Sequence, residues 1–367
     1  MKEGWIVKKL GEVCNTSSGG TPSKSHSEYY DGGTIPWLRS GEISKGNIYE
    51  TELFITEEGL KKSSAKIFPI NTVVIAMYGA TVGQIGILKK EMSTNQAVCG
   101  IYPNDVFSPD FLAYVLKNKK EKFILLASGG AQPNISQTII NQTYIPVPPL
   151  SEQSRIVEEL DLLSNIIEKK RQQLSELDNL AQSIFYDMFG DPVTNEKGWE
   201  VKTVGQLFEL KAGKAIKAKE LANEYEDGLY ACYGGNGIRG YIPKFSHSGC
   251  YPIIGRQGAL CGNVNLAKGD FYATEHAVVV SCNGNADAVW TYYCMVLMNL
   301  NRYAKGVAQP GISVNVINAV NIILPSLELQ QLFAQKIKAI EKQKALIKQS
   351  IAETEELFNS RMDYYFS

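Results

Sequence analysis

The sequence lacks the features that would place it in a membrane, in a secreted disulfide-bonded class or among metalloproteins. It has no run of eighteen apolar residues that could span a bilayer, and its start, MKEGWIVKKLGEV, does not resemble a signal peptide. Seven cysteines form no C-x-x-C pair and only three histidines are present, so no metal-ligand spacing exists. We therefore expect a cytoplasmic protein with buried free thiols, no metal site and no membrane partner.

A strong excess of positive charge is also missing. The formal net charge is −1 and the isoelectric point is about 6.4, which argues against a single strongly basic DNA-binding domain. The charge is unevenly distributed, however. Residues 1–150 and 193–327 each carry a net charge of +2, residues 151–192 carry −5, and residues 328–367 are neutral. The 367 residues are enough for two domains, and the two larger segments are mildly basic.

The chain contains an internal repeat. The segment AQPNISQTIINQTYIPVPPLSEQ at 131–153 aligns without gaps with AQPGISVNVINAVNIILPSLELQ at 308–330, and 11 of 23 positions are identical. The start of the chain repeats as well, because GWIVKKLGEVCNTSSG at 4–19 resembles GWEVKTVGQLFELKAG at 198–213. TNQAV at 94–98 corresponds to TEHAV at 274–278. Two copies are too few for a solenoid, so the pattern indicates a tandem duplication with pseudo-twofold character.

Each copy ends in a segment that is predicted to be one long helix. Residues 151–189 and 326–367 contain neither glycine nor proline, and their apolar residues alternate at spacings of four and three. This period of 3.5 residues is typical of a coiled-coil seam. We expect the two helices to pack antiparallel, with Leu163 and Leu174 facing residues such as Ile340 and Ile351. The predicted seam consists of Ile156, Leu160, Leu163, Ile167, Leu174, Leu177, Ile337, Ile340, Ile347 and Ile351.

The remaining segments are predicted to be rich in β-strands. Short apolar runs bounded by glycine, proline or asparagine occur at 72–79, 84–89, 97–103, 277–282 and 321–325. One helix is expected in each copy, at 108–126 and at 286–303. The sequence therefore predicts an α+β chain with four parts: domains at 1–150 and 193–327, and spacer helices at 151–192 and 328–367.

Two strings resemble enzyme motifs but lack the required context. Residues 235–240, GNGIRG, fit the dinucleotide-binding pattern, yet Tyr-Ile-Pro follows where a helix would be needed. Residues 141–144, NQTY, weakly resemble the N-P-P-Y sequence of amino-methyltransferases but lack both prolines. We expect a glycine turn at the first string, and we assign no catalytic residue in this chain.

With these segments, the chain resembles the specificity subunits of type I restriction–modification systems. The resemblance covers nearly the full length, and its most specific parts are GWIVKKLGEV, IPVPPLSEQSRIV and INAVNIILPSLELQQLF. It implies two target-recognition domains, each binding one half of a split double-stranded DNA target, with helices that set the spacing. It also implies two methyltransferase subunits, which would hold S-adenosylmethionine, and restriction subunits as partners. The chain itself would hold no cofactor and would not be an enzyme.

The candidate DNA-binding residues are polar side chains on glycine-rich loops at which the two copies differ. Arginine and glutamine can bind guanine or adenine through two hydrogen bonds, and lysines can contact phosphates. Arg256 and Gln257 are matched here with Ala80 and Thr81 of the first copy. The candidates are Lys24, Arg39, Tyr78, Thr81, Gln84, Asn95, Gln96, Lys214, Lys217, Arg239, Arg256, Gln257 and His276.

Structural explanations remain open for these residues. The glycines are equally compatible with ordinary hairpins, the lysines with solvated loops, and His276 with a structural role. A second function also remains open, in which a coiled-coil scaffold presents two ligand-binding domains to protein or glycan partners. An independent methyltransferase is disfavoured because no glycine-rich cofactor loop is present.

Overall fold

The computed structural model describes residues 5–129, 133–306 and 310–367. It divides into two compact units, Met1–Lys169 with Ser350–Ser367, and Lys170–Gln349. Each unit contains one globular domain and one half of each of two long helices. Ala131 and Gln132, with their counterparts Ala308 and Gln309, lie outside the described residues. Within the described part, no helix is long and apolar enough to cross a membrane.

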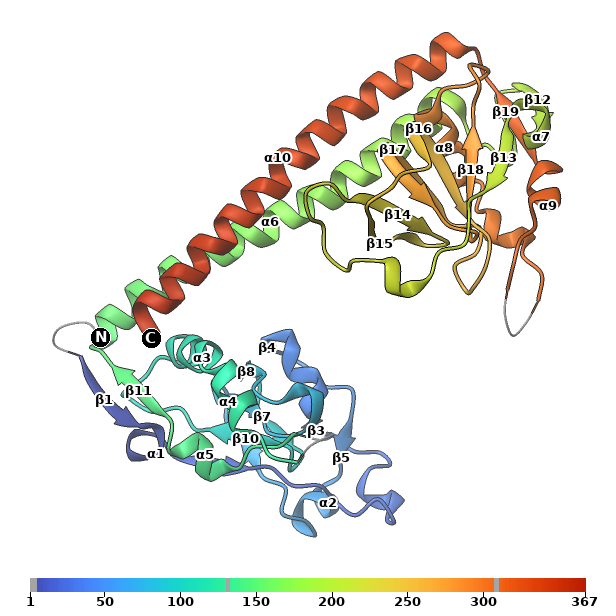
Figure 1. Ribbon diagram of the computed structural model, residues 1–367. Coiled ribbons are helices and arrows are strands. Elements are labelled where there is room, and N and C mark those ends of the chain that lie inside the picture. Colours follow the sequence, from blue (N-terminus) through green and yellow to red (C-terminus); the bar gives the residue numbers. More distant parts are fainter. Residues whose placement is uncertain (1–4, 130–132, 307–309) are drawn as a thin grey trace. The chain divides into compact units, whose positions relative to one another are not determined.

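The first unit contains an α+β domain with short strands (Figure 1). Its strands are β1 (Ile6–Lys9), β2 (Thr16–Ser18), β3 (Ile35–Leu38), β4 (Asn47–Ile48), β5 (Phe54–Ile55), β6 (Ile67–Phe68), β7 (Val73–Ala76), β8 (Ile85–Leu88), β9 (Met92–Thr94), β10 (Val98–Ile101) and β11 (Tyr144–Val147). Its helices are α1 (Leu10–Val13), α2 (Glu57–Lys61), α3 (Pro109–Asn118), α4 (Lys120–Leu126) and α5 (Gln137–Asn141), with 3-10 turns η1 (Ser27–Tyr29), η2 (Ser40–Lys45) and η3 (Gly79–Thr81). The sheet orders are β2-β10-β7-β8-β4, β5-β3-β9-β6 and β1-β11.

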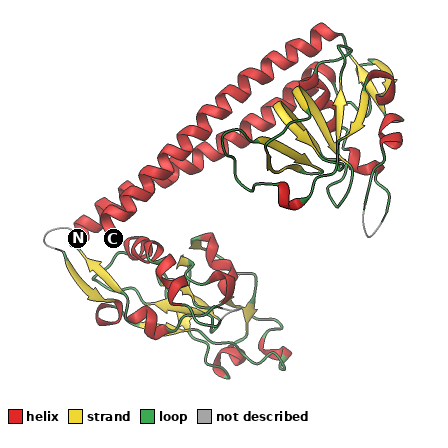
Figure 2. Ribbon diagram, viewed as in Figure 1, coloured by secondary structure: helices red, strands yellow, loops and turns green. Residues whose placement is uncertain are grey.

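The second unit contains a similar domain with longer strands (Figure 2). Its strands are β12 (Glu200–Thr203), β13 (Glu209–Ala212), β14 (Tyr230–Gly234), β15 (Gly237–Ile242), β16 (His247–Gly255), β17 (Val264–Ala273), β18 (Ala277–Ser281) and β19 (Asn321–Leu324). Its short helices are α7 (Val204–Leu207), α8 (Ala288–Leu297) and α9 (Val314–Asn318), with 3-10 turns η4 (Ala218–Glu220) and η5 (Leu300–Tyr303). The sheet orders are β13-β18-β16-β17-β14-β15 and β12-β19.

Two long helices link the repeated parts of the chain. These are α6 (Leu150–Phe189) and α10 (Leu327–Phe366), each of 40 residues. The predicted α+β class with two long helices is confirmed. The predicted helix at 108–126 is divided at Lys119 into α3 and α4, and the helix predicted at 286–303 ends earlier, because Asn299 adopts a left-handed conformation with φ +51°. The predicted domain boundaries stay predictions.

The repeated sequence segments build the same joint between each domain and its helix. Strand β1 pairs antiparallel with β11, and β12 pairs in the same way with β19, so the start of each copy meets the residues that precede the long helix of that copy. Ser136 and Ser313 cap α5 and α9 with their hydroxyl groups. The identities found in the repeat therefore reflect a shared local structure.

A fully buried glutamine fastens each long helix to its domain. The Gln153 amide donates to the carbonyls of Pro148 and Val106, at 2.9 and 2.8 Å, and accepts a hydrogen bond from the Ser108 N–H at 2.9 Å. Its counterpart Gln330 donates to Pro325 and accepts from the Asp287 N–H, both at 2.9 Å. Since Ser108 and Asp287 cap α3 and α8, the same side chain joins the first turn of the long helix to the start of the domain helix.

Within each unit, the halves of α6 and α10 pack antiparallel. In the first unit, Arg361 Nη2 donates to Glu159 Oε2 at 3.0 Å. In the second unit, Lys344 Nζ lies 2.7 Å from Asp178 Oδ1, and Phe333 contacts Phe185 with ring centroids 5.5 Å apart. All ten predicted seam residues are buried or partly buried, with the end positions Ile156, Leu160, Ile337 and Ile340 the most fully so. Such burial is what a seam between the two helices requires.

The predicted register of this seam is wrong by one heptad. The pairs Glu159–Arg361 and Asp178–Lys344 place Leu163 opposite Phe358 and Leu174 opposite Ile347, instead of opposite Ile351 and Ile340. A heptad pattern specifies which face is buried but repeats every seven residues, so it does not distinguish registers that differ by one heptad. Contacts at the helix ends supply the missing information.

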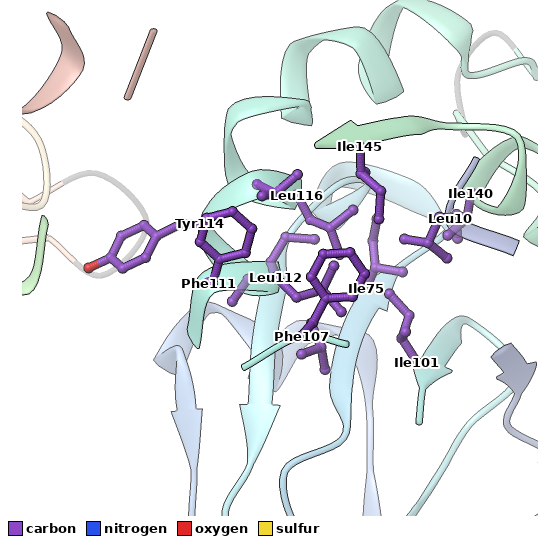
Figure 3. Close-up of a cluster of buried hydrophobic side chains, with 14 of the residues drawn as sticks. Leu10, Ile75, Ile101, Phe107, Phe111, Leu112, Tyr114, Leu116, Ile140 and Ile145 are labelled. Atoms are coloured by element: carbon purple, nitrogen blue, oxygen red, sulfur yellow. The ribbon is translucent and has the colours of Figure 1, made fainter. Parts of the chain in front are cut away.

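The core of the first unit, part of which is drawn in Figure 3, includes such an end contact. Phe111 and Leu112 of α3 pack with Ile75 of β7 and Ile145 of β11 in one buried cluster. The last residues of α10 join the same cluster, and the Phe366 ring meets Phe111 edge-on with centroids 5.6 Å apart. Burying one such ring stabilises the fold by roughly 1.5–3 kcal/mol. The end of the chain is therefore part of the first domain's core.

The prediction that all cysteines are buried is wrong for two of them. Cys250 is exposed and Cys282 is partly buried, although all seven are free thiols. Cys250 lies in the outer half of the long strand β16, where the hairpin with β17 extends beyond the domain core. The length of this strand accounts for the exposure of Cys250.

Candidate nucleic-acid interface

The two globular domains contain one loop of the same structure, which we call the G-A-x-x-G loop: residues 79–83 and 258–262. The first glycine N–H donates to a proline carbonyl, that of Pro133 at 2.8 Å or Pro310 at 2.9 Å. The last glycine N–H returns to the preceding strand, 2.9 Å from the Ala76 carbonyl or 2.7 Å from that of Gly255.

Positive φ angles explain why glycine occupies both ends of each loop. The φ angles are +70° and +77° in the first loop and +90° and +84° in the second. Residues with side chains are strained in this region, so a substitution at any of the four glycines would distort the loop. Between the glycines, Val82 and Cys261 are buried and anchor their loops to the core.

The shared hydrogen bonds correct the match between the two copies. They equate Gln257 with Tyr78 and Arg256 with Met77, because the carbonyls of Met77 and Arg256 accept equivalent bonds from Ile135 and Ile312, both at 2.9 Å. The match of Arg256 and Gln257 with Ala80 and Thr81 is therefore wrong. The strings GATVGQ and GALCGN align without gaps and indicate the correct match.

The second domain brings three candidates together at this loop. The Arg256 N–H donates to the His276 carbonyl at 3.1 Å. A Cβ on Gly235 would lie 3.5 Å from the carbonyl oxygens of both Gln257 and His276, so the β14–β15 turn lies against the same place. Asn263 Nδ2 donates to Asn236 Oδ1 of that turn at 2.9 Å. Arg256, Gln257 and His276 thus form one group from two separate segments, and the β14–β15 turn lies beside it.

Lys214 joins this group through its backbone. Its N–H donates to the Ala273 carbonyl at 3.0 Å, and the preceding Gly213 N–H donates to Ala277 at 3.1 Å. A Cβ at Gly213 would be only 1.9 Å from the Ala273 oxygen, so glycine allows the chain to pass this strand end. The Lys214 side chain is exposed. Lys217, which precedes η4, and Arg239 on β15 are exposed as well.

The first domain gathers its candidates in the corresponding place. The Asn95 N–H donates to the Leu38 carbonyl at 2.9 Å, which puts Asn95 beside Arg39, and the neighbouring Gln96 side chain accepts a hydrogen bond from Thr21. The Met77 N–H donates to the Ala97 carbonyl at 2.8 Å and connects this segment to the G-A-x-x-G loop. Tyr78, Thr81 and Gln84 therefore lie near Asn95 and Gln96, and Lys24 is exposed three residues beyond Thr21.

Arg39 is held by two carboxylates. Its Nη2 lies 2.5 Å from Glu52 Oε2, and its Nε lies 3.7 Å from Glu42 Oε1. The Arg39 side chain is 45% exposed, whereas that of Glu42 is buried. A phosphate or base that binds Arg39 must compete with Glu52, so this arginine is a weaker candidate than Arg256.

Several polar atoms near these loops are buried without a hydrogen-bond partner among the described residues. They include Gln84 Oε1 and Asn95 Oδ1 in the first domain, and Asn265 Nδ2, Glu275 Oε2 and His276 Nδ1 in the second. Each such atom costs about 1–3 kcal/mol unless a partner is supplied. His276 Nε2 also lies 3.3 Å from Glu275 Oε1.

The sequence prediction missed Glu275, Asn265 and Leu260. Glu275 occupies the position of Asn95 in the repeated T-x-x-A-V string, which was available as a signal. Leu260 is 56% exposed in the G-A-x-x-G loop. It is not among the candidates because these are polar residues only. Asn265 lies inside β17 and has no signal in the sequence.

The described residues contain no group of three or more His, Cys, Asp or Glu side chains that could hold a metal ion. The glycine-rich string at 235–240 forms the turn and start of the β14–β15 hairpin, as expected, and is not followed by a helix. This geometry does not provide the helix N-terminus that a dinucleotide phosphate would need.

Comparisons with known proteins agree with the duplicated architecture. A family model described as "Type I restriction modification DNA specificity domain" matches residues 2–179 and again 196–356. The chain is similar to the type I restriction enzyme EcoprrI specificity subunit of Escherichia coli, with 34% identity over 339 residues, 88% of this chain and 84% of that protein. The chain is also similar to the MjaIX specificity subunit of Methanocaldococcus jannaschii, with 26% identity over 376 residues, 92% of this chain and 86% of that protein.

Two solved structures have the same fold. One is the S subunit of a type I restriction–modification system from M. genitalium, with a TM-score of 0.62 and 16% identity over 100% of this chain and 98% of that one. The other, from a study of assembly and conformational transition in the type I system, has a TM-score of 0.64, 20% identity and the same coverage. Together with the two family matches, the duplicated domains and the paired helices, these findings show that the chain belongs to the specificity subunits of type I restriction–modification systems.

Proposed function

We propose that each domain of this subunit binds one half of a bipartite double-stranded DNA target. The observation that carries the proposal is the G-A-x-x-G loop, which is built twice with the same backbone hydrogen bonds but with different exposed side chains. A constant backbone with exchanged side chains is suited to two recognition sites that differ in sequence. Arg256 and Gln257 in the second domain, and Tyr78 and Gln84 in the first, are the proposed base-contacting residues.

The charge distribution supports binding within a complex. Each domain carries a net charge of only +2, and residues 151–192 carry −5, so this chain alone offers few phosphate contacts. We infer that two methyltransferase subunits bind together with it and supply further contacts, and that restriction subunits join this core. S-adenosylmethionine would then be held by the methyltransferase subunits, in the cytoplasm where the DNA lies. The specificity subunit would contribute recognition and no catalytic residue.

Salt titration of DNA binding tests this proposal. The apparent association constant is measured for a duplex carrying the target and for an unrelated duplex, with and without the methyltransferase subunits. Preference for the target should persist as salt rises, while the affinity for both duplexes falls with a slope that reports the number of phosphate contacts. Equal affinity for both duplexes in the full complex would contradict the proposal and would favour a scaffold for protein or glycan ligands.

A further inference from the structure

The G-A-x-x-G loops differ at two positions, and the second of these, Val82 or Cys261, is buried in both domains. The shared hydrogen bonds make Leu260 of the second loop equivalent to Thr81 of the first. Both residues lie between two glycines with positive φ angles, and both are followed by a buried anchor, Val82 or Cys261. The backbone at this position is therefore constant, and only the side chain changes.

Both side chains present an apolar group at this position. Leu260 is 56% exposed although the domain core lies directly beside it. The hydroxyl group of Thr81 donates to the Tyr78 carbonyl at 3.0 Å, inside its own loop. This internal bond leaves the Thr81 methyl group as the part of the side chain that remains for an outside contact.

Leu260 lies at a pocket whose lining is both polar and apolar. It borders a cavity of about 360 Å³ that is also lined by Asn263, Asn299 and Asn301. Of the large apolar residues that line it, Leu260 is more exposed than Val264 and Val296. An exposed apolar side chain beside several amide groups suits a ligand that carries a methyl group among hydrogen-bonding groups. In the major groove of DNA, thymine has this pattern, because its C5-methyl group lies next to the O4 acceptor.

We propose that Leu260, and at the equivalent position Thr81, contact the C5-methyl group of a thymine in their respective half-targets. The proposal rests on the proposed function, because it names the base feature that one loop position recognises. Each half-target must then contain a thymine, on either strand, whose methyl group contributes to binding. The two positions act on different thymines, since they belong to different domains.

Replacement of thymine by uracil tests this proposal, because it removes only the methyl group. The target is first identified by sequencing the methylated DNA of a host that carries this subunit and its methyltransferase. Binding of the complete methyltransferase complex is then measured on duplexes in which each thymine is replaced in turn. The wild-type complex should lose about three- to tenfold affinity at one thymine in each half, the amount expected for one buried methyl group.

Two variants assign these thymines to their residues. Leu260→Ser should bind the thymine duplex more weakly and should no longer distinguish thymine from uracil at one position in one half. Thr81→Ser keeps the hydroxyl group but removes the methyl group, and it should have the same effect in the other half. Leu53→Ser, at an exposed leucine of the first domain outside the loop, serves as the control and should leave both responses unchanged.

The outcomes separate this proposal from the function on which it rests. If the wild-type complex prefers its target but is insensitive to every thymine replacement in either half, the methyl contact is wrong while DNA recognition stands. The same conclusion follows if Leu260→Ser still distinguishes thymine from uracil, weakens all duplexes equally, or only impairs assembly with the methyltransferase. If the wild-type complex does not prefer its target over unrelated DNA, the proposed function itself fails.

Discussion

Arg256 lies two residues before the second G-A-x-x-G loop. Its backbone is fixed by hydrogen bonds, and its side chain is only partly buried. Its N–H and carbonyl groups are bonded to His276 and Ile312, so the side chain starts from a defined position. Arg256→Ala should weaken recognition of one half-target by about 1–3 kcal/mol, at one or two base pairs, if the guanidinium group binds a guanine edge.

Competition binding with single-base variants of the target checks this expectation. Arg302→Ala provides a matched control, since Arg302 is an exposed arginine of the same domain that bonds to the Tyr303 hydroxyl. A loss of similar size on all sequences would assign Arg256 to a phosphate contact, and no loss would assign it a structural role.

The ion pair between Glu159 and Arg361 makes helix pairing in the first unit depend on pH. The hydrogen bonds from Arg361 hold the pKa of the Glu159 carboxyl below its usual range, and burial opposes this effect. Because the pKa is lower in the folded state, the stabilisation is present above the unfolded pKa and is lost as pH falls through the folded value.

Glu159→Gln should therefore reduce stability by about 1 kcal/mol at pH 7 and much less under strongly acidic conditions. Chemical denaturation of the variant and the wild type at several pH values gives the comparison. A difference that stays constant down to strongly acidic pH would show that packing, rather than charge, causes the loss.

At the scale of secondary-structure elements, the buried glutamine at each joint has the largest expected effect. Gln153→Leu would leave the Ser108 N–H and two carbonyl groups buried without partners, and each costs about 1–3 kcal/mol. We expect a loss of roughly 3 kcal/mol in the unfolding free energy, because some of these groups will gain access to water. Gln172→Leu, on the exposed surface of the same helix, should cost little. Equal melting temperatures for both variants would contradict this account.

The sequence predicted those elements that depend on local patterns and missed features that depend on distant contacts. The internal repeat and the heptad spacing predicted the duplicated domains and the buried face of α6 and α10, because both depend on patterns that are local in sequence. The seam register could not be predicted, since it depends on contacts such as Phe366 with Phe111 that are distant in sequence. The joining of Gly235, Gln257 and His276 at one loop was missed for the same reason.

At the scale of the whole molecule, we expect the long helices to set the length of the spacer between the two half-targets. Inserting one heptad into α6 near Lys170 preserves the phase of the seam and lengthens the helix by about 10 Å, which corresponds to roughly three base pairs. The two half-target sequences should stay unchanged, because neither domain is altered, while the spacer between them should lengthen. The lengthening could fall short of three base pairs, because α10 has no matching insertion, and stability should decrease. Methylated sites in a host that expresses the variant would show the spacer directly. An unchanged spacer with full activity would mean that the helices do not set the distance.

We propose that two domains in one chain recognise two separate halves of one target. Single-molecule sequencing of methylated bases, in a host with and without this subunit and its methyltransferase, tests it most directly. New methylation is expected at a target of two specific sequences separated by bases of no fixed identity. A continuous target without an unspecified spacer, or methylation that does not depend on this subunit, would contradict the account.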